Sequence, residues 1–175
     1  MIIQFCGMSG AGKTTLALQT KIQLEQLNIP VEIIDADEYR KHIIKDLGFS
    51  KQDRCENIRR LAFIADKFST HNIVTIICAI NPYEEIRKEL KNTYKNVKTI
   101  FINCDISELI KRDTKGLYKK ALLPDNHSDK IRNLTGINDP FEMPIDADLI
   151  VYTDKESIKV SAERIVQFIK TNYQA

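Results

Sequence analysis

The sequence of 175 residues has little net charge, no long apolar run and no paired cysteine motif. Its formal net charge is only +2, so bulk electrostatics favours neither nucleic acid nor a membrane surface as a partner. No apolar stretch approaches the roughly 20 residues that a membrane helix needs. The first residues, MIIQFC, also lack the basic-then-apolar pattern of a signal peptide.

Cysteine is present but shows no CxxC spacing, which argues against a disulfide framework or a clustered metal site. We therefore expect four reduced packing residues in a cytoplasmic protein. These cysteines are Cys6, Cys55, Cys78 and Cys104.

Internal repeats, low-complexity tracts and Gly/Ser-rich linkers are also missing, and the length suits one domain over residues 1–175. Short runs rich in Ile and Val predict buried parallel strands at residues 2–6, 31–34, 73–79, 97–103 and 149–152. Stretches of helical periodicity separate these runs. The alternation predicts an α/β fold, a three-layer sandwich with a parallel five-stranded sheet.

Three helical faces carry this periodicity, each with apolar residues three or four positions apart. They consist of Leu16, Thr20, Leu24 and Leu27; of Ile58, Leu61, Ala62 and Ala65; and of Ile158, Ala162, Ile165, Val166 and Ile169.

Residues 114–144, called the lid segment below, interrupt the alternation with Gly, Pro, Asn and Asp and show no strand pattern. A connection of this length in a compact domain is usually functional. Its interleaved apolar residues argue against a disordered surface loop. We predict a mobile but packed lid.

The string GMSGAGKT matches G-x-x-x-x-G-K-[ST], follows a predicted strand and opens a predicted helix. Glycines let backbone N–H groups surround phosphate oxygens, and the helix N-terminus adds positive potential. Lys13 is expected at the β- and γ-phosphates, and the Thr14 hydroxyl at Mg²⁺. The predicted nucleoside triphosphate site comprises Gly7, Ser9, Gly10, Ala11, Gly12, Lys13, Thr14 and Thr15.

Two acids, Asp35 and Asp37, follow the second apolar run, and in an extended chain they would point the same way. We predict that Asp35 serves the metal and that Asp37 takes a proton from an attacking hydroxyl, which phosphoryl transfer requires. With Lys13 they form the predicted catalytic set. Alternatively, Asp37 caps the helix that begins at Glu38.

Arginines cluster near Phe49 in GFSKQDRCENIRR, with Arg40 upstream. Guanidinium groups and an aromatic face would suit an anionic acceptor that carries a base. Arg54 and Arg60 do not share a helical face, so the cluster is not one solvated stripe. Surface ion pairs with Asp53 and Glu56 remain the alternative.

Taken together, these strings resemble the adenylylsulfate (APS) kinases along nearly the whole chain. The strings are GMSGAGKTT, DADEYR, DLGFSKQDRCENIRR, NPYEEIR, RDTKGLYKKA and LTGINDPFEMP. The resemblance implies an ATP-dependent kinase that phosphorylates the ribose 3′-hydroxyl of APS to give PAPS, with Mg²⁺ as cofactor and a homodimeric assembly. A small-molecule nucleotide is then the partner, and the implied fold is that of a P-loop NTPase similar to nucleotide kinases.

The resemblance also implies residue roles. Arg112 would lie near the ATP adenine, and Phe49 would stack on the acceptor base. The other implied acceptor and lid residues are Asp37, Arg40, Arg54, Asn57, Ile80, Arg87, Lys115, Gly116, Leu117 and Tyr118.

Departures from the family pattern leave the acceptor open. Asn81 stands where the family has a serine sometimes drawn as a phosphorylated intermediate, so we expect direct transfer. Leu134 replaces a phenylalanine that would enclose the acceptor adenine opposite Phe49. Losing one stacking face should cost about 1–3 kcal/mol. Overall similarity to the family makes APS the leading acceptor, and these substitutions make cytidine diphosphoramidate of capsule pathways the alternative. A non-catalytic nucleotide-binding regulator is a third hypothesis.

Overall fold

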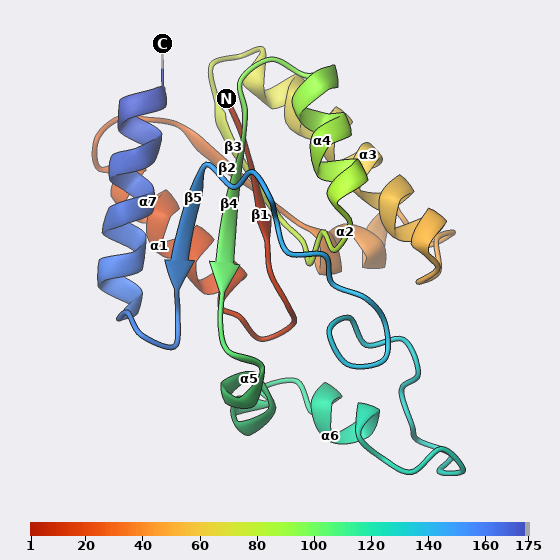
Figure 1. Cartoon of the computed structure of the whole chain (residues 1–175). Coiled ribbons are helices and arrows are strands. Elements are labelled where there is room, and N and C mark those ends of the chain that lie inside the picture. The colour runs from red at the N-terminus through yellow and green to blue at the C-terminus, as the bar shows by residue number, and fades with distance from the viewer. Residues whose placement is uncertain (174–175) are drawn as a thin grey trace.

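The computed structural model describes residues 1–173 and contains one five-stranded parallel sheet in the order β2-β3-β1-β4-β5 (Figure 1). The strands lie within one residue of their predicted bounds, which confirms the predicted fold class. They are β1 (Ile2–Cys6), β2 (Val31–Asp35), β3 (Val74–Cys78), β4 (Val97–Asn103) and β5 (Leu149–Tyr152).

Helices cover both faces of this sheet and form the outer layers (Figure 1). One face carries α1 (Lys13–Glu25) and α7 (Ile158–Asn172), which contact each other. The opposite face carries α3 (Lys51–Ser69) and α4 (Glu84–Thr93). Shorter helices follow strands β2 and β4 or open the lid segment. They are α2 (Ala36–His42), α5 (Ile106–Arg112) and α6 (Leu117–Ala121).

The central strand β1 shows why the sheet must be covered on both faces. Ile3 and Phe5 pack into the hydrophobic cluster that includes α1 and α7, whereas Ile2 packs into the cluster of α3 and α4. Successive side chains of a strand point to opposite faces, so a fully buried strand is apolar on both. Gln4 interrupts this pattern on the α4 side, where it is fully buried.

The predicted helical faces are buried except at two positions. Leu27 is 46% exposed because α1 has already ended and the chain turns through Asn28 at φ 57°. Ile158 is 55% exposed because it is the first residue of α7, before the packed face begins. Helical periodicity alone does not locate such ends.

The lid segment begins with α6 and is irregular afterwards, apart from an isolated bridge between Thr135 and Asp139. Tyr118 and Leu134 are buried, whereas Leu122 is exposed. The segment is therefore packed, as predicted, and its motion remains a prediction.

All four cysteines are buried and unpaired, in agreement with the packing role predicted for them. Among residues 1–173, no helix combines the length and the apolar character required to cross a membrane.

Candidate active site

The loop between β1 and α1 has the geometry of a phosphate cradle. Gly12 adopts φ 96°, a left-handed conformation that favours glycine, and a Cβ at Gly7 would lie 2.3 Å from the carbonyl oxygen of Ile102. No side chain caps the N-terminus of α1, and no acid lies in its first turn. The first N–H groups of α1 therefore remain available to an anion, supported by the helix dipole.

Lys13 folds back over this loop. Its Nζ donates hydrogen bonds to the carbonyl oxygens of Gly7 (2.9 Å) and Met8 (2.8 Å). Burial lowers the pKa of Lys13 to about 8. A buried ammonium group beside unpaired backbone N–H groups is suited to bind phosphate oxygens, because their negative charge would stabilise the charged form of Lys13.

Asp35 at the end of β2 lies beside Thr14 of α1. The Thr14 hydroxyl donates to Asp35 Oδ2 at 2.8 Å, and Asp35 Oδ1 accepts from the backbone N–H of Asp37 at 2.9 Å. The helix cap is thus Asp35, and the alternative that Asp37 caps the helix is wrong. The extended-chain argument is wrong as well, because Asp37 already lies in the first turn of α2.

Hydroxyl and carboxylate oxygens are ligands that Mg²⁺ prefers, and Mg²⁺ usually completes its shell with water and substrate phosphates. Thr14 and Asp35 fit this donor set at the edge of the phosphate cradle. Within residues 1–173 no group of three or more His, Cys, Asp or Glu side chains could hold a metal without such help.

Asp37 pairs with the lid segment rather than with Asp35. Lys115 Nζ lies 2.6 Å from Asp37 Oδ2. Burial raises the pKa of Asp37, but the hydrogen bond and charge of Lys115, with the charges of Lys13 and Lys41, hold that pKa below its usual range. A carboxylate kept ionised in this way can accept a proton.

The aromatic face of Phe49 is flanked by two guanidinium groups, as expected from the sequence cluster. Arg40 lies 4.8 Å and Arg54 5.5 Å from the ring centroid. Phe49 itself is 54% exposed. Arg40 also donates to the carbonyl oxygens of Leu47 and Gly48, which fixes the loop that presents the ring.

Arg54 links this loop to the lid segment. Its guanidinium donates to the carbonyl oxygens of Phe49 (3.0 Å) and Asn133 (2.7 Å), and it lies 3.1 Å from Asp139. Asn57 lies one turn further along α3, and its buried Oδ1 has no hydrogen-bond partner. Because buried polar atoms are normally paired, Asn57 fits a residue that awaits a ligand donor.

Arg59 and Arg60 form surface ion pairs, as the alternative interpretation of the arginine cluster expected. Arg59 binds Glu89, and Arg60 binds Asp46 and Glu56. Asp53, the other acid of the surface alternative, instead forms a capping box with Ser50 at the start of α3. The cluster therefore divides into buried Arg54 and two arginines, Arg59 and Arg60, that form surface ion pairs.

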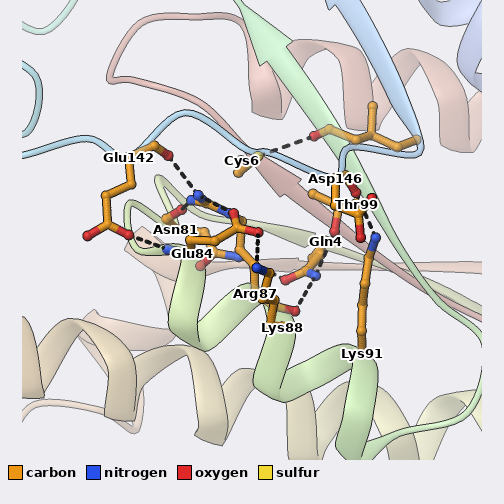
Figure 2. A network of polar contacts seen from close by, with 11 residues as sticks. Gln4, Cys6, Asn81, Glu84, Arg87, Lys88, Lys91, Thr99, Glu142 and Asp146 are labelled. Atoms are coloured by element: carbon orange, nitrogen blue, oxygen red, sulfur yellow. Dashed lines mark hydrogen bonds and ion pairs between the residues drawn. The ribbon is translucent and has the colours of Figure 1, made fainter.

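Three further predicted acceptor residues occupy different environments. The carbonyl oxygen of Ile80 accepts from the backbone N–H of Gly7, so Ile80 adjoins the phosphate cradle. Leu134 is only 6% exposed and belongs to the hydrophobic cluster that includes Tyr118. Arg87 is 2% exposed and directs its guanidinium to protein acceptors (Figure 2).

Arg112 is linked to the cradle by Thr153. The Arg112 guanidinium donates to the carbonyl oxygen of Thr153 at 2.9 Å. The Thr153 hydroxyl in turn donates to Ala11 at 2.9 Å. Sequence reasoning missed Thr153 and Asp139 because neither lies in a motif with a fixed spacing.

The remaining lid residues open α6 beside the cradle. Gly116 precedes α6 in a left-handed conformation (φ 65°), and Leu117 is its first residue. The Tyr118 hydroxyl donates to the carbonyl oxygen of Ser9 at 2.8 Å. The start of the lid segment is thus attached to the P-loop.

A parallel sheet, a P-loop with its lysine, and acids after the second strand define a P-loop kinase. A family model described as adenylylsulphate kinase matches residues 1–152. The adenylyl-sulfate kinase of Synechococcus sp. (strain JA-3-3Ab) is 37% identical over 170 residues, covering 97% of this chain and 94% of that protein. That of Halothermothrix orenii is 38% identical over 168 residues, with 96% and 88% covered.

The solved structure of Mycobacterium tuberculosis APS kinase CysC in complex with AMPPNP and APS superposes with a TM-score of 0.89. It is 29% identical and covers 97% of this chain and 96% of its own. This chain belongs to the adenylylsulphate kinase family. It is an enzyme, a phosphotransferase with a hydroxyl acceptor, and not a non-catalytic regulator.

Proposed function

We propose that the protein transfers the γ-phosphate of ATP to the ribose 3′-hydroxyl of APS, giving PAPS and ADP. Similarity to adenylyl-sulfate kinases over almost the whole chain supports this substrate pair. The observation that carries the proposal is the pairing of two sites. The P-loop lies beside Asp35 and Asp37, and an aromatic ring in the loop before α3 is flanked by guanidinium groups from α2 and α3.

On the donor side, the first N–H groups of α1 and the ammonium of Lys13 bind the phosphates. Thr14 and Asp35 would hold Mg²⁺, which neutralises phosphate charge when bound. Arg112 and Thr153 would border the adenine. The remaining P-loop residues keep their predicted roles in binding ATP.

On the acceptor side, Asp37 accepts the proton of the 3′-hydroxyl as that oxygen forms its bond to the γ-phosphorus. The bond from the γ-phosphorus to the oxygen of ADP breaks in the same step. Lys115 keeps Asp37 ionised and links the lid segment to this acid. Lid closure would exclude water, which otherwise competes as the acceptor.

Transfer is direct, without a phosphorylated protein intermediate. Asn81 replaces the family's serine, and its amide has no hydroxyl to phosphorylate. The side chain is also 2% exposed and bonded to Gln4 inside the sheet. This position therefore faces away from the donor.

Arg40, Arg54 and Asn57 bind the anionic end of the acceptor, and Phe49 stacks on its base. Arg87 does not bind the acceptor itself, because its N–H donors already bond protein oxygens. It supports the acceptor site by holding the loop after β3. The alternative acceptor, cytidine diphosphoramidate, is favoured by Leu134, because a leucine replaces the phenylalanine that would stack on adenine opposite Phe49. The comparisons with known proteins give that alternative no support, so APS is preferred.

The proposed enzyme is a single kinase domain with a moving lid, acts in the cytoplasm and forms homodimers. Four unpaired, buried cysteines support a reducing compartment. Homodimers are implied by the family resemblance, although one structural relative is named as a hexameric APS kinase from Thiobacillus denitrificans.

The test is release of ADP by the purified protein with Mg·ATP and each acceptor in turn, against a reaction without acceptor. We expect APS to accelerate ADP release well above background hydrolysis. Failure of every nucleotide acceptor to do so would refute the proposal.

A further inference from the structure

A buried polar network connects β1 to the loop after β3 and to α4 (Figure 2). Gln4, in the middle of β1, donates through Nε2 to Thr99 Oγ1 (2.8 Å) and to the carbonyl oxygen of Arg87 (3.1 Å). A buried amide costs free energy unless it is hydrogen-bonded. These two contacts fix the orientation of the amide and direct Oε1 toward Asn81.

Asn81 completes the amide pair. Its Nδ2 donates to Gln4 Oε1 at 2.9 Å, and its backbone adopts a left-handed conformation with φ 48°. Asparagine tolerates this conformation better than most side chains. The side chain thus ties a tight turn of the loop after β3 to the interior of the sheet.

The same loop touches the phosphate cradle. The carbonyl oxygen of Ile80 accepts from the backbone N–H of Gly7, the first P-loop glycine, at 3.1 Å. Gln4 lies only three residues before Gly7 on the strand that leads into the cradle. The amide pair and the backbone contact therefore hold the loop against the cradle from two sides.

Arg87 extends the network to the C-terminal end of the lid segment. Its guanidinium donates to the carbonyl oxygens of Asn81 (2.6 Å) and Glu142 (2.7 Å). Glu142 also donates from its backbone to Pro82 O (2.8 Å) and accepts from the backbone N–H of Glu84 (2.6 Å). One loop thus anchors both the cradle edge and the lid.

We propose that Gln4 and Asn81 are positioning residues for transfer to the acceptor. They hold residues 79–82 in a fixed position relative to the P-loop, and through this loop they also fix the contacts of Ile80 with Gly7 and of Glu142 with Pro82. Both side chains point into the sheet, so neither touches the reacting atoms. The inference rests on the proposed function, because it requires an acceptor beside this loop. A misplacement of about 1 Å can reduce transfer by about a hundredfold.

The test compares Asn81→Gly with Asn72→Gly. Asn72 also has a left-handed backbone (φ 60°), but it lies before β3, at the opposite end of that strand. Glycine relieves the backbone at both positions, so only the loss of the Asn81 amide distinguishes the variants. We expect Asn81→Gly to lower kcat/KM for APS about a hundredfold and to leave the KM for ATP within about twofold, with both constants unchanged in Asn72→Gly.

Gln4→Met removes the other half of the pair at similar volume, and it supplies the test if Asn81→Gly folds poorly. If the two residues act as one unit, the double variant with Gln4→Met and Asn81→Gly should be no worse than the stronger single variant. Unchanged kcat/KM for APS in every variant, or a KM for ATP that rises as much as kcat/KM for APS falls, would overturn the positioning role. If the unaltered protein fails to phosphorylate APS, the proposed function fails instead.

Discussion

The ammonium of Lys115 lies 2.6 Å from the carboxylate of Asp37, and this contact joins the lid segment to the acid proposed to accept the hydroxyl proton. The contact spans 78 residues of sequence. It brings a positive charge from the lid to the carboxyl end of the sheet. Its effect on the Asp37 pKa gives a first prediction.

Lys115→Met should move the acid limb of the kcat/KM profile for APS to higher pH. Lys115 is one of the groups that hold the Asp37 pKa below its usual range, so removing it raises that pKa. Asp37 then becomes protonated, and inactive as a base, at a higher pH. The measurement is the pH profile from the acid side to neutrality.

Lys111→Met is the matched control for this profile, because Lys111 is an exposed lysine of α5 paired with Glu108. Its acid limb should coincide with that of the unaltered protein. Both partners of the Lys115–Asp37 pair are more than half exposed, so stability should change by less than about 1 kcal/mol. An acid limb that stays in place would remove Asp37 from the base role.

ATP affinity should fall as pH rises through about 8. Burial lowers the pKa of Lys13 to about 8, so in the free protein Lys13 is protonated below this value and neutral above it. Phosphates bind the protonated form, and binding above pH 8 must therefore take up a proton. We expect the Kd for ATP to rise by up to about tenfold per pH unit in calorimetric titrations.

Lys13→Ala should abolish transfer to any acceptor and also remove this pH dependence, because no titrating cation then faces the phosphates. Lys21→Ala is the control, since Lys21 lies on the same helix and pairs with Glu25 and Glu32. Substantial turnover in Lys13→Ala would contradict the assignment of the donor site.

Leu134→Phe should tighten APS binding by up to about 1–3 kcal/mol if a missing stacking face limits adenine. Leu134 is buried within the hydrophobic cluster, so the larger ring should also cost about 1–3 kcal/mol of stability. Equilibrium titration with APS and thermal unfolding measure the two effects separately. An unchanged APS affinity would show that other residues select the base.

Arg87→Met should destabilise the fold by about 3–5 kcal/mol, because it leaves the carboxylate of Glu84 without its buried partner. Arg59→Ala, which removes an exposed pair with Glu89, should cost no more than about 1 kcal/mol. Urea unfolding of both variants checks the difference. Equal losses would contradict the structural role of Arg87.

The sequence could predict the sheet and the cradle because their signals are local. Strands buried on both faces are apolar throughout, and a P-loop needs glycines and a lysine at fixed spacing. The predicted strands and the GMSGAGKT loop therefore match the structure closely. The helix ends at Leu27 and Ile158 were missed because periodicity does not mark where packing stops.

Contacts between distant segments could not be predicted in the same way. Asp35 and Asp37 both suit a helix cap, and only the backbone geometry shows that Asp35 takes it. Nothing local in the sequence shows that the Arg87 guanidinium donates its hydrogen bonds to Asn81 and Glu142. Such side chains acquire their partners only when the strands have assembled.

The most direct test of the central claim is a competition for limiting ATP labelled at the γ-phosphate, with APS and cytidine diphosphoramidate at equal concentrations. Product analysis then shows which acceptor carries the label and at which hydroxyl. The account predicts label on the ribose 3′-oxygen of APS, in large excess over the cytidine product. Label mainly on the cytidine nucleotide, or on neither acceptor, would contradict it.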